Sequence, residues 1–233
     1  MHSELGQFFK PHYLRYAIVL IASTSLVVGC KKEKPAPEDE IPQWVKKYKI
    51  QCPSKSKVRF DENSKYCVKL GNPHGPMMKW YPTGKKQQKS NYTNGNEDGE
   101  WLEWYPNGQK RAQSNWVDGQ PDGKQVQWFK NGKKQAESYY KDGEKHGSDT
   151  IWHENGKIKT KGNYENGKRA GLKTFYFNNG KKDWEGTFVN DKEHGTFTQW
   201  YESGQKKGEG PYQEGIKTGE WVYWNKDGTV MAN

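Results

Sequence analysis

Aromatic residues recur at fixed intervals along the chain, and short polar stretches with glycine separate them. The period is 24 residues, without insertion or deletion. Each unit opens on a glycine, which we count as position 1: Gly75, Gly99, Gly123, Gly147, Gly171, Gly195 and Gly219. A strict period of this size is typical of a repeat protein, in which each unit stacks only on its neighbours.

Turn residues divide each unit into two short runs. Asn-Gly pairs occupy positions 9 and 10 of four units, as in Asn107-Gly108, and a second turn follows at positions 20 and 21, as in Asn94-Gly95. Such pairs between aromatic-rich runs favour β-hairpins with type I′ turns, which need positive φ at both central residues. The pattern therefore predicts an all-β protein: an elongated antiparallel meander of stacked β-hairpins in a single extended sheet.

Alternation along the strands predicts which side chains pack together. We expect the packed face to combine the apolar or β-branched residues of position 4, the aromatic residues of position 18 and an aromatic ladder at position 6. The ladder comprises Trp80, Trp104, Trp128, Trp152, Tyr176, Trp200 and Trp224. Position 16 holds only serine or glycine, which should leave room for a ring of the neighbouring unit.

A second set of aromatic residues is expected to be exposed on the opposite face, where it forms a candidate binding face. These residues are Trp101, Tyr105, Phe129, Phe177, Phe197, Tyr201 and Trp221. The alternative is that they pack within the twisted sheet.

The first residues have the pattern of an export signal. Lys10 and Arg15 precede an apolar run, residues 17–28, which is shorter than the ~20 residues that span a bilayer and suits a signal peptide. The run ends in Gly29-Cys30, which resembles the bacterial lipobox, so we expect residues 1–29 to be a lipoprotein signal peptide and Cys30 to be lipidated. A plain secretory signal is the alternative. The Pro-rich, charged residues 30–43 are expected to be a flexible tether.

Two further cysteines, Cys52 and Cys67, lie in residues 44–74. An exported compartment permits a disulfide, and this segment shares the repeat register, since Gly71 lies one period before Gly95. We therefore expect residues 44–74 to be a disulfide-stapled half-repeat that caps the seven repeats of residues 75–233, the last one truncated. A redox-active pair is the alternative, although the C-x-x-C spacing is lacking.

Charge and composition narrow the kinds of fold and partner that this chain can have. Only 31% of residues are hydrophobic while 14% are aromatic, so a thin sheet is favoured over a thick core. The formal charge is +10, but only four of the 38 basic residues are arginine, the usual residue for bidentate phosphate and base contacts. Nucleic acid is therefore an unlikely partner, and the lysines are interpreted as solubilising groups or as an attraction to an acidic surface.

No catalytic or metal-binding pattern stands out. His74, His146 and His194 share position 24, but copies of one position lie two strands, ~9.6 Å, apart, too far for one zinc ion. Glutamates such as Glu103 and Glu220 sit at repeated or surface positions. We expect no enzyme activity, no cofactor and no metal.

Recurrent Trp-Tyr-x-x-Gly-x-Lys segments, such as the one beginning at Trp80-Tyr81, and the stretch from Tyr164 to Gly171 resemble MORN repeats, closest to the bacterial MORN variant. The resemblance covers residues 75–228. It implies an antiparallel β-meander used for protein contact, dimerisation or membrane association. Proteins of this type are often labelled YwqK-like antitoxins. The lipobox departs from that pattern, because a lipoprotein outside the cytoplasm cannot neutralise a cytoplasmic toxin.

The sequence therefore predicts a non-enzymatic lipoprotein of the bacterial cell envelope. Lys31, and not Asp, directly follows Cys30, which resembles lipoproteins of the enteric type that are destined for the outer membrane. The expected partners are the membrane, through the lipid, and a protein. The alternatives are an envelope glycan or anionic lipid bound through aromatic and lysine residues, and a YwqK-like antitoxin. The oligomeric state stays open, as does whether the last strand pairs with another chain.

Overall fold

The computed structural model of the protein describes residues 41–231. The expected signal peptide, Cys30 and most of the tether lie outside these residues. One short helix, α1 (Gln43–Lys47), precedes eighteen strands in one sheet. The strands are β1 (Lys57–Phe60), β2 (Ser64–Lys69), β3 (Asn72–Trp80), β4 (Lys86–Thr93), β5 (Asn96–Glu97), β6 (Gly99–Trp104), β7 (Lys110–Val117), β8 (Gln120–Pro121), β9 (Gly123–Trp128), β10 (Lys134–Lys141), β11 (Glu144–Trp152), β12 (Ile158–Glu165), β13 (Lys168–Tyr176), β14 (Lys182–Val189), β15 (Lys192–Trp200), β16 (Lys206–Gln213), β17 (Ile216–Lys217) and β18 (Val222–Tyr223).

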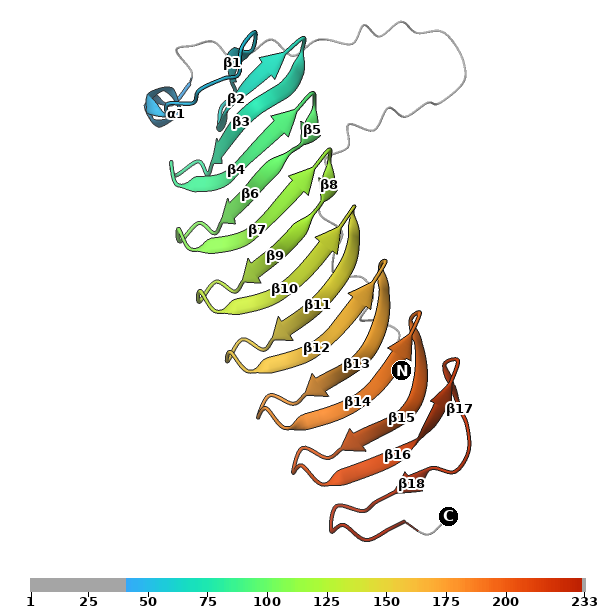
Figure 1. The fold of residues 1–233 in the computed structure, drawn as a ribbon. Coiled ribbons are helices and arrows are strands. Elements are labelled where there is room, and N and C mark those ends of the chain that lie inside the picture. The colour runs from blue at the N-terminus through green and yellow to red at the C-terminus, as the bar shows by residue number, and fades with distance from the viewer. Residues whose placement is uncertain (1–40, 232–233) are drawn as a thin grey trace, which may run out of the picture. The chain divides into compact units, whose positions relative to one another are not determined.

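Every pairing between these strands is antiparallel and, except where a strand is split in two, joins a strand to the next one along the chain (Figure 1). In three units the opening strand is broken in two, so that β4 pairs with both β5 and β6, β7 with both β8 and β9, and β16 with both β17 and β18. The prediction of a single antiparallel meander of stacked hairpins is confirmed.

The turn at positions 20 and 21 joins one unit to the next and is a type I′ turn. Both central residues have positive φ, as in Asn94 (52°) with Gly95 (97°) and Asp118 (48°) with Gly119 (78°). The fifth unit has Asn190 (49°) and Asp191 (70°) instead of a glycine at position 21. The Asp191 carboxylate accepts hydrogen bonds from the backbone N–H and Nε of Arg169, at 2.9 and 3.0 Å, which helps to hold this turn without glycine.

The turn at positions 9 and 10 differs from the predicted type I′ turn. Among the described residues, Gly108 has φ of 90° while Asn107 does not belong to those with positive φ. The N–H of Gly108 donates to the carbonyl of Tyr105 at 2.8 Å, and the register shifts by one residue beside Trp104. These are the features of a three-residue loop: a type I turn, then glycine in a left-handed bulge. Asn107 favours this loop because its Oδ1 accepts the N–H of Gln109 at 3.1 Å.

The register places position 3 opposite position 16, and position 1 opposite position 18, as in Trp101 with Ser114 and Gly99 with Trp116. Residues directly opposite each other share a face. We call the face with positions 3, 16 and 18 the small-residue face, and the face with positions 4, 6, 12 and 15 the tryptophan face. The predicted packed face is therefore wrong in one respect, because the aromatic residues of position 18 lie across the sheet from the ladder of position 6.

Small residues at position 16 do receive a side chain of the next unit, as predicted. A Cβ on Gly186 would lie 2.3 Å from the Phe197 ring, and one on Gly210 would lie 2.4 Å from the Trp221 ring. Ser90 is 1% exposed at the same position. Ring-to-backbone contact between units therefore replaces the interior of a two-layer protein.

Hydrogen bonds join neighbouring units along both rows of turns. On one side, the hydroxyl groups of Tyr81, Tyr105 and Tyr201 each donate to the position 6 carbonyl of the next unit, at 2.7–2.8 Å. His153 occupies the same position, and its Nε2 lies 2.9 Å from the carbonyl of Tyr176. On the other side, the N–H of Gly119 donates to the carbonyl of Glu97 at 2.8 Å, and other units repeat this bond.

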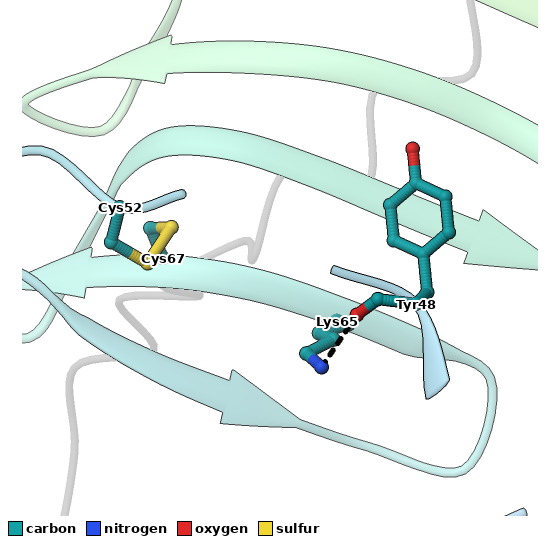
Figure 2. The surroundings of a disulfide bond; sticks show 4 residues. All are labelled: Tyr48, Cys52, Lys65 and Cys67. Atoms are coloured by element: carbon teal, nitrogen blue, oxygen red, sulfur yellow. Dashed lines mark hydrogen bonds between the residues drawn. A yellow bond between two sulfur atoms is a disulfide. The ribbon is translucent and has the colours of Figure 1, made fainter. Parts of the chain in front are cut away.

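We call the segment before the first unit, residues 41–71, the cap: its strands β1 and β2 pair with each other, and β2 pairs with β3. Cys52 and Cys67 form a disulfide with a Cα–Cα distance of 5.5 Å (Figure 2). Helix α1 was not predicted. Its Val45 is 0% exposed and packs with Met78 and Trp80, which lie on the tryptophan face. Ile41 is 5% exposed in the same cluster, so residues 41–43, which we assigned to the tether, belong to the cap.

Lys65 holds the end of α1 in place. Its Nζ donates to the carbonyl of Tyr48 at 2.7 Å (Figure 2). It also donates to the carbonyl of Lys46 at 3.2 Å and lies 4.8 Å from the centre of the Phe60 ring. Burial lowers the pKa of Lys65. The helix thus covers the tryptophan face of the first unit, while the later units carry no such helix within the described residues.

The contact between Gly186 and Phe197 predicts a matched pair of substitutions. We expect Gly186→Ala to lower the free energy of unfolding by ~1–3 kcal/mol, because the new methyl group overlaps a buried ring. Gly162→Ala should cost less, since its Cβ meets only the flexible Lys173 side chain, at 3.0 Å. Neither glycine has a positive φ. The difference in stability between the two variants should therefore come from steric overlap and not from backbone strain. Urea unfolding measures both, and equal losses would contradict the packing described here.

Candidate functional site

At position 3 of the small-residue face the residue type differs from one unit to the next. The residues along this row are Met77, Trp101, Gln125, Asp149, Lys173, Phe197 and Trp221. Apolar side chains occupy both ends of the row, Met77 and Trp101 at one end and Phe197 and Trp221 at the other, and polar or charged side chains occupy the middle three units. The neighbouring rows change less, since position 16 is always small and position 18 is always aromatic.

The two ends of the row are packed aromatic clusters. The Trp101 ring centre lies 6.2 Å from that of Tyr92 and 6.0 Å from that of Trp116. Near the other end, Phe197 lies 5.6 Å from Phe188 and 4.7 Å from Tyr212. Rings at these distances stabilise one another and the stack of units.

The middle of the row is a buried polar cluster centred on Asp149, which is 3% exposed. Its Oδ1 accepts hydrogen bonds from Ser138 Oγ at 2.6 Å and from Lys145 Nζ at 2.7 Å. Tyr140 and Tyr164 lie on either side, in the position 18 row. Burial raises the pKa of both tyrosines, to about 12 for Tyr140, and the negative charge of Asp149 adds to the effect.

Two further basic side chains extend this cluster toward the fifth unit. Burial lowers the pKa of Lys173, although the Asp149 charge opposes the shift. Lys173 Nζ lies 5.3 Å from the centre of the Tyr164 ring, and Lys145 Nζ lies 4.8 Å from the same ring. Arg169 lies 4.4 Å from the centre of the Phe188 ring. We call Tyr140, Lys145, Asp149, Tyr164 and Lys173 the mid-sheet cluster.

The seven aromatic residues predicted to be an exposed binding face fall into two groups. Phe197 is 7% exposed, and Trp101 and Trp221 are half-buried in ring clusters of the small-residue face. Tyr105 and Tyr201 lie beside the turns and bond to the next unit, while Phe129 and Phe177 hold the corresponding backbone turn bonds. The prediction of one exposed aromatic face is wrong because the register buries position 3 against position 16.

The ladder of position 6 lies on the tryptophan face with a lysine beside most of its rings. Lys86 lies 5.9 Å from the Trp104 ring centre, and the position 12 lysines of the second, third, fifth and sixth units repeat this contact with the next unit, at 5.3–5.8 Å. The fourth unit has Ile158 instead, and the ring it would face is Tyr176 rather than tryptophan. Cation–π contacts of this kind stabilise the join between units.

Sequence reasoning missed the mid-sheet cluster, although a signal was present. Asp149 and Lys173 interrupt a row that is apolar at both ends, and Ser138 stands opposite Asp149 in the register that the turns imply. Within residues 41–231, no group of His, Cys, Asp and Glu side chains could hold a metal ion. Over the same residues, no helix is long and apolar enough to cross a bilayer.

The surroundings of Tyr140 in the mid-sheet cluster predict how its hydroxyl group titrates. Because burial and Asp149 favour the neutral form of Tyr140, the unfolded chain, with its tyrosine pKa near 10, ionises before the folded one. The stability that this tyrosine contributes is therefore complete below pH ~10 and is lost as the pH rises toward the folded pKa of about 12. Asp149→Asn should lower the Tyr140 pKa while burial keeps it raised.

Carbon-13 NMR of the tyrosine rings measures these pKa values one by one. Tyr92 is the internal control, since its raised pKa follows from burial and Glu97, not from Asp149. A Tyr140 pKa that Asp149→Asn leaves unchanged would contradict the proximity of the two groups.

Comparison with family models gives five matches, all to a model described as MORN repeat variant: residues 73–94, 97–118, 121–142, 145–166 and 193–214. Each matched segment runs from just after one type I′ turn into the next, so it holds one hairpin of the sheet. The fifth unit forms the same hairpin but is not among the matched segments. Comparison with curated proteins gave no match. The five segments show that this chain carries MORN-type repeats.

Proposed function

We propose that this protein is a non-enzymatic scaffold that binds a protein partner through the mid-sheet cluster and its neighbours on the small-residue face. The observation that carries the proposal is the change of residue type along position 3, from apolar side chains to Gln125, Asp149 and Lys173 and back to aromatic side chains. Rows that hold units together keep one residue type in most units. A row that changes while positions 16 and 18 beside it do not is suited to recognising something outside the sheet.

Stability alone does not account for the charged middle of this row. A buried ion pair such as Asp149 with Lys145 is costly to desolvate, and apolar residues of similar size often stabilise a protein as well or better. The same row accommodates Trp101 and Phe197 on either side of its polar middle, so an aromatic residue fits the backbone of this row. Charged residues in the middle would instead give directional contacts that select one partner.

The proposal also assigns a place to the scaffold. Residues 30–40 would link a lipidated Cys30 to the cap, and the lipid would hold the repeats at the surface of an envelope membrane, with the outer membrane as the expected one. MORN-type repeats commonly serve protein or membrane interaction, which supports a binding role. The resemblance to YwqK-like antitoxins also points to a protein partner, and a lipid anchor would restrict that partner to exported proteins.

Photo-crosslinking tests the binding face. A photoreactive amino acid at Gln125 or Lys173, in the full chain expressed in cells, should give a discrete crosslinked species. The matched controls are Ser148 and Lys161, which are exposed on the opposite face. Equal crosslinking from both faces would contradict the proposal, as would its absence from Gln125 and Lys173 at normal protein levels.

Cell fractionation tests the anchor separately. The wild-type chain should be acylated and found with membranes, and Cys30→Ala should release it, because two or three acyl chains are needed for stable attachment. Mass spectrometry of the N-terminal peptide reports the acylation directly. Unprocessed, unacylated wild type in the soluble fraction would overturn the lipoprotein part of the proposal and favour the antitoxin alternative.

A further inference from the structure

The turns lie in two rows at opposite ends of the strands (Figure 1). The two rows carry opposite net charge. We call positions 8–13 the basic edge: residues 82–87, 106–111, 130–135, 154–159, 178–183, 202–207 and 226–231. It holds fourteen Lys and Arg residues against four Asp and Glu residues, a net of +10, which equals the net charge of the whole chain.

The opposite row, positions 19–24, is acidic. It comprises residues 93–98, 117–122, 141–146, 165–170, 189–194 and 213–218. Here ten acidic residues face six basic ones, a net of −4. Solubility requires only a net charge and does not separate the signs. The separation instead gives the sheet one edge that attracts anions along its full length.

Several lysines of the basic edge are held in register by uncharged acceptors. Lys133 Nζ donates to the carbonyl of Asn155 at 2.8 Å, and Lys157 Nζ donates to the carbonyl of Asn179 at 2.6 Å. A carbonyl oxygen is an uncharged acceptor, and an ammonium group has three donors. Each of these lysines thus keeps donors for an incoming anion.

Some of the positive charge of the basic edge is neutralised by ion pairs at position 12. Lys134, Lys182 and Lys206 pair with glutamates of position 15, at 2.6–2.7 Å. These three pairs lie toward the tryptophan face and leave a large excess of positive charge on the turns. Neighbouring turns stand ~9.6 Å apart, about one Debye length at 0.1 M salt. The charges of adjacent units therefore still repel one another, and a bound polyanion would relieve that repulsion.

We infer that the basic edge binds a linear anionic polysaccharide, with its carboxylate or sulfate groups lying along the row of turns. A row of single turns, repeated once per unit, fits an extended polymer. Lysine dominates the row, and its one arginine, Arg111, pairs with Glu103 at 3.4 Å. Proteins bind nucleic acids through aromatic side chains that stack on bases and through arginines that make bidentate contacts. These turns do not present such groups.

A membrane surface fits this edge less well. Stable attachment of a protein surface to lipid needs apolar area as well as positive charge. The exposed apolar side chains Val117, Val189 and Ile216 lie on the acidic edge instead, and on the basic edge only the last turn exposes Val230 and Met231. The basic edge is therefore hydrophilic along most of its length, as a sugar polymer requires.

Heparin, a sulfated linear polysaccharide, is the probe, with neutral dextran as the ligand control. The full chain should bind heparin at low salt, with an affinity that falls steeply as salt rises, and should not bind dextran. The test variant is Lys85→Glu/Lys130→Glu/Lys159→Glu, three exposed residues of the basic edge. It should bind heparin about tenfold or more weakly, as expected for removing several charges from one contact surface.

The matched control is Lys141→Glu/Lys161→Glu/Lys168→Glu, which makes the same change in net charge at exposed positions outside the basic edge. It should keep most of the wild-type affinity. Equal losses in the two variants would show attraction to net charge alone and overturn the inference. Failure of the wild type to bind heparin would do so too, as would tighter binding to phosphatidylglycerol vesicles that the edge variant abolishes. None of these results bears on crosslinking at the small-residue face, so the two proposals fail separately.

Discussion

The fold depends on one contact between units: a small residue at position 16 that receives the position 3 side chain of the next unit. At Gly186 and Gly210 the approach is so close that a Cβ would overlap a ring. Because few aliphatic residues are available, this contact takes the place of a hydrophobic core. The rings of position 18 then pack against those of position 3, and hydrogen bonds at both rows of turns keep the spacing constant. Each unit is thus stabilised only by the units beside it, as in other repeat proteins.

Because the fold depends on this contact, the sequence can vary at position 3 only in ways that position 16 allows. Position 3 can hold Trp101, Asp149 or Phe197 provided that its neighbour at position 16 stays small. With Ser138 opposite, the room is filled by a carboxylate that bonds the serine and Lys145. With Gly186 opposite, it is filled by a ring. The same geometry therefore supports either packing or polar recognition, and the side chains at the turns can differ in charge without disturbing the sheet.

Much of the fold could be predicted from the sequence, because period, turn residues and the Cys52–Cys67 pair all report on local geometry. Three features could not. The loop at Asn107-Gly108 is a type I turn with a bulge because the Asn107 side chain bonds its own backbone, a choice that the Asn-Gly pair does not specify. The faces were assigned by residue type, and rings occur on both faces, so only the register separates them. Helix α1 depends on contacts of Val45 with Met78 and Trp80, far along the chain.

The cap also clarifies what the two faces are suited to do. Helix α1 covers the tryptophan face of the first unit, and beyond it lysines cover the rings of that face, so most of its aromatic surface already has a partner within the chain. The small-residue face carries the one charged cluster that interrupts its aromatic row, and the basic edge carries charge without an apolar surface. A protein bound to the face and a polymer bound to the edge would approach from different sides. One sheet could therefore hold both at once, because the face and the edge are different surfaces of the same units.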